Sequence, residues 1–237
     1  MRKDFLNSGN EPILLKNMKC KIAIFDLDGT LLDTLQDLAI SANFALEACG
    51  YPKRTIEEIR CFVGNGIEKL IERASPADIS ADDRKKILEI FKLHYADHCE
   101  DHTAPYDGIV PLLDCLAEAG ISLAVVSNKI DSAVRSLCEK YFGNRFSVAI
   151  GEREGIRRKP CPDSVLEVLS ETEFSLENAV YIGDSEVDIL TARNAGMEAI
   201  IVTWGFRDKD FLKASGAKTL VDSVAEIGRL LLGESVK

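Results

Sequence analysis

Five short runs of apolar residues, rich in Ile and Val, recur along the chain. They are continuous rather than alternating, which is typical of strands covered on both faces of a sheet. The runs occupy residues 22–25, 122–127, 147–150, 179–183 and 199–203. Between the apolar runs lie segments with apolar residues at helical spacing, and they end at glycines: 110–120, 131–143 and 188–196. The alternation predicts an α/β fold with a Rossmann-like, doubly wound parallel sheet.

The segment 34–105 interrupts this alternation. It holds amphipathic helix patterns and no convincing strand; the patterns span 35–50, 56–74 and 81–99. We therefore expect an inserted α-helical cap domain. The expected division is 1–17 as an N-terminal extension, 18–33 with 106–237 as the catalytic core, and 34–105 as the cap. Ligands of doubly wound sheets bind beyond the carboxyl ends of the strands, so the site should lie between core and cap.

Composition limits the possible binding partners and the cellular location of the protein. The 237 residues are 46% hydrophobic and 29% charged, as in ordinary globular proteins. The net charge of -10 without a basic patch predicts no nucleic-acid partner, and an anionic substrate must be attracted by local groups. Seven scattered cysteines without a C-x-x-C pair argue against zinc and favour reduced thiols in the cytoplasm. The apolar run at 13–15 is too short for a signal or a membrane span, and a homodimer is left open.

Polar residues follow several of the predicted strands at the point where each ends. Asp26 and Asp28 come directly after the first strand, and an acidic pair there is costly unless a cation or hydrogen bonds satisfy it. The other strand ends supply Ser127, Asn128, Lys159, Asp184 and Asp188. Carboxylates without His or Cys suit Mg²⁺, and a lysine with a hydroxyl suits a phosphoryl group. The pattern indicates a metal-assisted phosphate site.

Each of these features also has an ordinary explanation. Asp28 with the following glycine is a turn signal, and Asp188 is a reasonable N-cap acid. Ser127 and Asn128 can be a polar strand end, and Lys159 a solvated loop lysine. The occurrence of all of them at the ends of one sheet favours a site. We interpret Arg157 and Arg158 as surface charge, while Lys129 either binds a substrate carboxylate or faces solvent.

Four motifs in order, "DLDGTL", "VVSNK", "KPCP" and "GDSEVD", resemble those of the haloacid dehalogenase superfamily of aspartyl-nucleophile hydrolases. The resemblance covers the chain from about Lys21 onward and implies a cap inserted between the first two motifs. It implies that Asp26 is the nucleophile and Asp28 the general acid and then base. Ser127 and the amide of Asn128 would hold phosphoryl oxygens.

The resemblance also implies the charged partners of the reaction. Lys159 would stabilise the nucleophile and the phosphate charge. Mg²⁺ would be bound by Asp26, the backbone carbonyl of Asp28 and Asp184. Asp188 would hold Lys159 and order water on the metal.

The reaction class depends on the second acid. Asp28 favours phosphate ester chemistry over dehalogenation, and no His-Lys pair of a mutase is found in the cap. The loop Gly64-Asn65-Gly66 precedes a predicted helix, so its amides either bind an anion or form a plain turn. With "PYDGI" at 105–109 and "TWGFRD" at 203–208, this loop resembles bacterial phosphoglycolate phosphatases.

We therefore predict a magnesium-dependent phosphatase that hydrolyses a small phosphorylated metabolite through an aspartyl-phosphate intermediate. The substrate best supported by the resemblance is 2-phosphoglycolate. Pyrophosphate, a nucleotide or a sugar phosphate remain as alternatives. A non-catalytic binding module on the same fold is disfavoured, because the nucleophile, acid, lysine and metal carboxylates are all intact.

Overall fold

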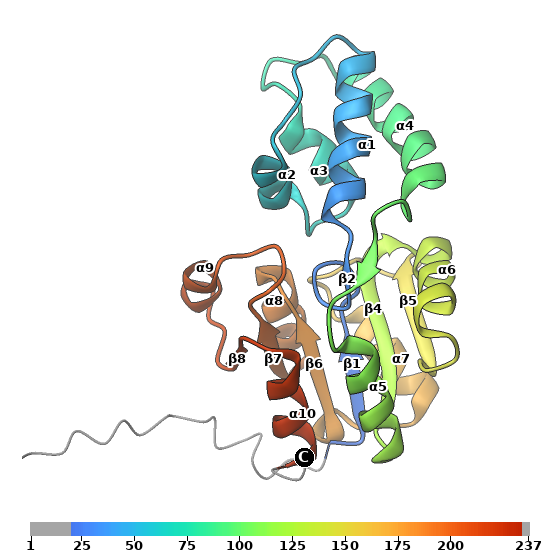
Figure 1. Ribbon diagram of the computed structural model, residues 1–237, viewed down its shortest axis with the longest axis vertical. Helices are drawn as coiled ribbons and strands as arrows, with labels where there is room; N and C mark the ends of the chain where they lie inside the picture. Colours follow the sequence, from blue (N-terminus) through green and yellow to red (C-terminus); the bar gives the residue numbers. More distant parts are fainter. Residues whose placement is uncertain (1–19, 234–237) are drawn as a thin grey trace, which may run out of the picture.

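The computed structural model describes residues 20–233, so the predicted extension at 1–17 lies outside the described residues. Its core is a parallel sheet in the order β5-β4-β1-β6-β7-β8 (Figure 1). The strands are β1 (Ile22–Phe25), β4 (Ser122–Ile130), β5 (Val148–Glu152), β6 (Ala179–Gly183), β7 (Glu198–Val202) and β8 (Leu220–Val221). The predicted α/β fold with a parallel sheet is confirmed, and β8 adds a short edge strand that was not predicted.

Helices cover both faces of this sheet. One face carries α5 (Ile109–Glu118), α6 (Asp131–Phe142) and α10 (Val224–Leu232), and the other carries α7 (Asp163–Thr172) and α8 (Glu186–Ala195). The short α9 (Lys209–Ala214) packs beside α8 and β7. In β1, Ala23 and Phe25 contact the first layer while Ile22 and Ile24 contact the second. Successive side chains of a strand point to opposite faces, which explains why the strand is apolar at every position.

Four helices form a group above the carboxyl ends of the strands (Figure 1). They are α1 (Leu35–Ala48), α2 (Ile56–Phe62), α3 (Ile67–Ala74) and α4 (Ala81–His98). Their buried residues form an apolar cluster of their own, which includes Leu46, Ile59, Ile71 and Phe91. One residue from the core, Phe206, also belongs to this cluster. The four helices therefore pack as a unit that touches the core at defined points.

The chain enters and leaves the helical unit through a small antiparallel ribbon that was not predicted. It pairs β2 (Leu32–Asp33) with β3 (Ala104–Pro105), and Asp33 lies opposite Ala104. Both crossings between core and cap therefore run side by side.

The strand order reverses at β1. The chain leaves β1 for β4 and β5 on one side and returns to β6, β7 and β8 on the other. The register of β4 against β5 shifts between Val126 and Ile130, and the strand runs to Ile130. Such irregularities re-aim side chains. Three consecutive residues at this end of β4, Ser127, Asn128 and Lys129, are all buried near the switch point.

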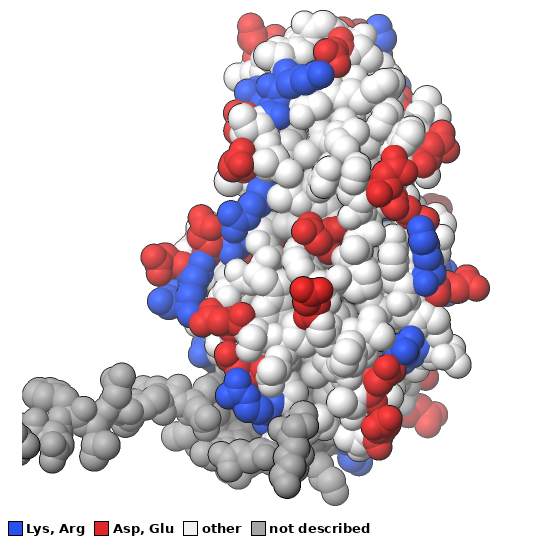
Figure 2. Space-filling view, in the orientation of Figure 1, with Lys and Arg blue, Asp and Glu red and all other residues white. Residues whose placement is uncertain are grey.

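The face drawn in Figure 2 carries mixed charge, and the cysteines are free thiols. On the face drawn in Figure 2, acidic and basic side chains are interspersed rather than gathered by sign. All seven cysteines lie in the described part of the chain and none is in a disulfide. Among residues 20–233, no helix is both long and apolar enough to cross a membrane.

Candidate active site

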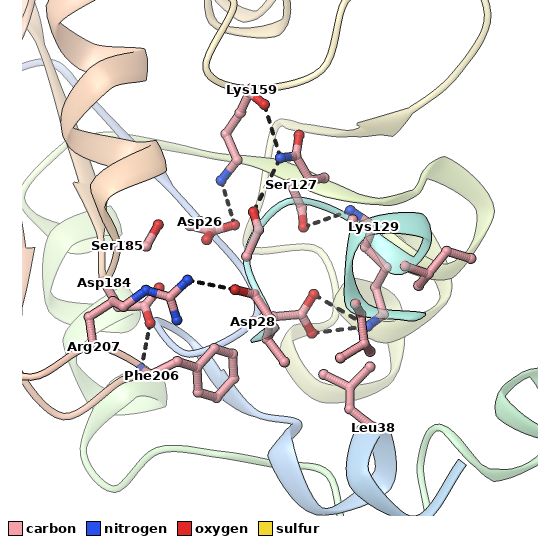
Figure 3. A pocket seen from close by; sticks show the side chains of 16 residues that line it. Asp26, Asp28, Leu38, Ser127, Lys129, Lys159, Asp184, Ser185, Phe206 and Arg207 are labelled. Carbon is pink, nitrogen blue, oxygen red and sulfur yellow. Dashed lines mark hydrogen bonds and ion pairs between the residues drawn. The ribbon is translucent and has the colours of Figure 1, made fainter. Parts of the chain in front are cut away.

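The polar residues from the strand ends meet at one cavity of ≈ 60 Å³ below the cap (Figure 3). The core contributes Asp26, Asp28, Ser127, Asn128, Lys159 and Asp184 to its wall. From the cap loop, Gly64 and Gly66 line the cavity, whereas Asn65 lies in a neighbouring groove, where its side chain accepts a hydrogen bond from Arg73. Asp188 lies behind the wall. The sequence-predicted residues are thus brought together at or behind this cavity, except Asn65, which lies in the neighbouring groove.

Lys159 connects two of the acids. Its Nζ lies 2.8 Å from Asp26 Oδ1 and 2.8 Å from Asp188 Oδ1, and it donates to the hydroxyl of Tyr181 at 3.1 Å. The lysine is only 3% exposed. Burial alone would lower the pKa of Lys159, but the charges of Asp188 and Asp26 raise it well above its ordinary value. Lys159 is therefore a fixed ammonium group beside Asp26.

Asp188 is a hub of hydrogen bonds. Its Oδ1 accepts from Lys159 and from Tyr181, and its Oδ2 accepts from the hydroxyl of Ser185 at 2.6 Å and from the amides of Ser185 and Asp184 at 3.1 and 3.2 Å. Helix α8 begins at Glu186 with Ser185 at the N-cap, so Asp188 stands in the first turn rather than at the N-cap. Both of its oxygens are occupied, which makes it an anchor for Lys159.

Asp184 is fixed by backbone that approaches it closely. Its Oδ2 accepts the amide of Phe206 at 2.7 Å. A Cβ on Gly205 would lie 2.3 Å from that oxygen, and a Cβ on Gly29 would lie 2.5 Å from it, so only glycine leaves room at either position. Burial, followed by the charge of Asp188, raises the pKa of Asp184 to about 7. The carboxyl group is held rigidly where its negative charge is poorly compensated.

The acids form an arrangement that fits a cation. One oxygen each from Asp26, Asp184 and Asp188 lie within 4.8 Å of one another, and all three residues are buried. Burial raises the pKa of Asp26 well above its ordinary value, although Lys159 opposes the shift. Lys159 pairs with two of these three carboxyl groups, those of Asp26 and Asp188, and the possible metal ligands are all oxygen atoms. Such a set suits a hard divalent cation, which would favour the ionised carboxylates.

Asp28 has a separate lysine. Lys129 Nζ donates to Asp28 Oδ1 at 2.9 Å and Oδ2 at 3.3 Å (Figure 3). It also donates to the hydroxyl of Tyr95 at 2.7 Å. Lys129 is buried, so the interpretation as a solvent-facing residue is wrong. Burial alone would lower the pKa of Lys129, but Asp28 and Tyr95 raise it. Because Tyr95 belongs to α4, Asp28 is connected to the cap through Lys129.

Two arginines were not recognised from the sequence. Arg207 lines the cavity and donates hydrogen bonds to cap carbonyls, although the sequence pointed only to the motif "TWGFRD" that contains it. Arg158 was interpreted as surface charge, but it pairs with Glu152 and with Glu68 of the cap. The sequence around Arg207 and Arg158 does not reveal these contacts, because their partners in the cap lie far away along the chain.

The polar floor of the cavity is closed by apolar residues. They come chiefly from the cap: Leu38, Val63, Ile67 and Leu70, joined by Phe206 from the core. Such walls exclude water from the polar groups and strengthen their electrostatic interactions.

Comparison with known proteins agrees with this geometry. The family model of haloacid dehalogenase-like hydrolases matches residues 23–202. The chain belongs to this family. The resemblance inferred from the four motifs is thereby confirmed.

Among members of the haloacid dehalogenase-like family, the chain is similar to phosphoglycolate phosphatases. It is 33% identical to that of Vibrio parahaemolyticus, covering 87% of this chain and 94% of the relative. It is 36% identical to that of Agrobacterium fabrum, covering 79% and 82%. A crystal structure from Lactobacillus delbrueckii, provisionally assigned as a phosphoglycolate phosphatase, has a TM-score of 0.88 at 40% identity and covers 92% of this chain and 100% of its own. These relatives place the chain among the phosphoric monoester hydrolases of the family.

Proposed function

We propose that the protein is a magnesium-dependent phosphatase that hydrolyses 2-phosphoglycolate through an aspartyl phosphate on Asp26. The observation that carries this proposal is that two acids on one cavity wall have different lysine partners. Asp26 is paired with Lys159, and Asp28 with Lys129. Two carboxyl groups in distinct environments can take distinct roles in one reaction.

In the first step, an oxygen of Asp26 attacks phosphorus while the bond from phosphorus to the ester oxygen breaks. Asp28 gives its proton to the departing oxygen. In the second step, Asp28 takes a proton from water, whose oxygen attacks phosphorus and releases phosphate and Asp26. Ser127, the amide of Asn128 and Lys159 hold the phosphoryl oxygens throughout.

The metal would be held by Asp26, Asp184 and the backbone carbonyl of Asp28. Bound there, Mg²⁺ would offset the repulsion between Asp26 and the phosphate. Asp188 contributes from behind, since both of its oxygens already accept hydrogen bonds from Lys159, Tyr181 and the start of α8.

Two features support a substrate with a short distal anion. The cavity of ≈ 60 Å³ is small, which suits a two-carbon ester better than a nucleotide or a sugar phosphate. The amides of Gly64 and Gly66, which line the cavity, donate no hydrogen bond to any described residue, so they are available to a carboxylate. We further propose that residues 34–105 form the cap and that 18–33 with 106–237 form the core. We also propose that the protein acts in the cytoplasm, where its seven free thiols would persist.

A panel of phosphate esters tests the substrate. With Mg²⁺ present, we expect kcat/KM for 2-phosphoglycolate to exceed that for pyrophosphate, a nucleotide and glucose 6-phosphate by at least about tenfold, since one lost anion contact is worth that factor. A higher value for one of the others would replace the substrate while keeping the phosphatase. No hydrolysis of any ester would favour a binding module.

Lys159 offers a test of the site itself. We expect Lys159→Ala to reduce kcat by about 10² to 10³, the usual effect of losing one preorganised electrostatic contact. Arg157→Ala is the matched control, because that cation is two residues away and pairs with Asp163 on the surface. It should stay within about twofold of wild type. Steady-state kinetics beside thermal unfolding distinguish lost chemistry from lost folding, and a Lys159→Ala enzyme with wild-type kinetics would refute the assigned role.

A further inference from the structure

The segment that follows β7 contacts both the site and the cap. The amide of Phe206 holds Asp184, while the phenyl ring of Phe206 packs within the apolar cluster of the cap helices. The next residue, Arg207, is 8% exposed and lines the cavity. Gly205 abuts Asp184 without room for a side chain, so the segment is held tightly against the site. Residues 205–207 therefore connect the core to the cap beside Asp184.

The guanidinium group of Arg207 spans the boundary (Figure 3). On the core side, its Nε donates to Glu186 Oε2 at 2.8 Å. On the cap side, Nη1 donates to the carbonyl of Arg60 at 3.1 Å and Nη2 to the carbonyl of Val63 at 2.6 Å. These carbonyls lie at the C-terminal end of α2, where helix carbonyls lack partners and the helix dipole favours a cation. Arg207 therefore satisfies the end of a cap helix from the core.

The same cap loop has two weaker attachments to the core. Asn128 Nδ2 donates to the carbonyl of Gly64 at 3.4 Å, and Arg158 Nη1 to that of Asn65 at 3.5 Å. Three consecutive carbonyls, from Val63 to Asn65, thus face core donors. The contact at 2.6 Å is the only short one of the three and is charge-assisted, so Arg207 contributes most to holding the loop.

We propose that Arg207, anchored by Glu186, is the positioning residue that docks the cap and thereby restricts the cavity to phosphate monoesters with small leaving groups. This inference rests on the proposed phosphatase function. The docked loop supplies Val63, Gly64 and Gly66 to the cavity wall, so releasing it enlarges the space beside Asp26 and Asp28. Arg207 acts through the position of the loop rather than through contact with the reacting atoms.

The alternative is that Arg207 binds the distal anion of the substrate directly. Its charge is already paired with Glu186, and its three nitrogens all donate to protein oxygens. Binding a substrate carboxylate would require breaking some of these contacts. The two roles predict opposite behaviour toward bulky esters that carry no distal anion.

The test compares Arg207→Ala with a control at the same seam. Asp208→Asn removes an ion pair with Arg60 of the cap, but Asp208 is 80% exposed and such pairs contribute little. Kinetics are measured with 2-phosphoglycolate and glucose 6-phosphate. In Arg207→Ala we expect KM for 2-phosphoglycolate to rise about tenfold and the kcat/KM ratio of glucose 6-phosphate to 2-phosphoglycolate to rise at least about tenfold. Asp208→Asn should change neither by more than about twofold.

A second variant guards against simple misfolding. Arg207→Lys keeps the charge beside Glu186 but cannot reach two carbonyls with a planar fork, so an intermediate ratio is expected. A loss of folded enzyme lowers the measured rates with both substrates by the same factor, so by itself it does not change the kcat/KM ratio. An unchanged ratio in Arg207→Ala, with 2-phosphoglycolate still hydrolysed, would overturn the docking role while leaving the phosphatase intact.

Hydrogen exchange of the peptide covering residues 59–66 gives a readout independent of activity. Arg207→Ala should exchange faster there than either wild type or Asp208→Asn, because the loop opens more often. Equal exchange in all three proteins would refute docking by Arg207, whatever the substrate is. If the wild type hydrolyses no ester but the exchange differs as expected, the proposed function fails and the docking role stands.

Discussion

Asp26→Asn is expected to reduce turnover by at least about 10⁴, because removing the nucleophile of a concerted set of groups abolishes nearly all of its acceleration. No phosphoenzyme should form in this variant. Asp28→Asn should behave differently, because it keeps the nucleophile and loses the base that activates water. With an aryl phosphate, whose leaving group needs no proton, the first step should proceed and the second should stall.

The measurement is the mass of the intact protein after brief reaction and acid quench, followed by peptide mapping. Asp28→Asn should carry a phosphoryl group on Asp26, while Asp26→Asn should carry none. With 2-phosphoglycolate both variants should be almost inactive, since its alkyl leaving group requires protonation. A phosphoryl group on Ser127, or on Asp28 in the wild type, would reverse the assignment of the two acids.

Removal of divalent cations is expected to abolish hydrolysis, and addition of Mg²⁺ should restore it. Lys159 pairs with Asp26 and Asp188, so one ammonium group serves a cluster of three carboxyl groups, and an incoming phosphate meets uncompensated negative charge. Dialysis against a chelator followed by titration with Mg²⁺ measures the effect. Full activity after exhaustive chelation would contradict the metal assignment.

A stability measurement separates binding from catalysis. A cation that binds only the folded state raises the unfolding temperature with its concentration. Mg²⁺ should therefore stabilise the wild type and fail to stabilise Asp184→Asn. Asp114→Asn, which alters an ion pair with Arg145 away from the cluster, is the matched control and should retain the stabilisation.

The strand ends were predictable because buried parallel strands appear in the sequence as continuous apolar runs. The apolar run before Asp26 and the run before Asp184 mark β1 and β6, and their carboxyl ends must meet at one edge of the sheet. The candidate catalytic acids could therefore be placed at one edge of the sheet from local pattern alone. The switch of strand order at β1 then brings Ser127 from the neighbouring β4 to the same place.

The links between cap and core were not predictable in this way. Lys129 meets Tyr95 across 34 residues of sequence, and Arg207 meets Val63 across 144. No periodicity relates such partners, since the contact depends on how the four cap helices rest on the core. The register shift of β4 against β5 could not be predicted either, because it depends on how the two strands pair.

The ribbon of β2 and β3 has a consequence for how this architecture can vary. Because Asp33 faces Ala104, the entire insert is closed at its base like the loop of a hairpin. The entropy lost on closing a flexible loop rises only with the logarithm of its length, by about 0.6 kcal/mol for each doubling. The sheet can therefore accept an insert of very different length at this point with little change in chain entropy. Inserts of other lengths would change which substrates can enter the cavity, while the polar residues at the strand ends would stay in place.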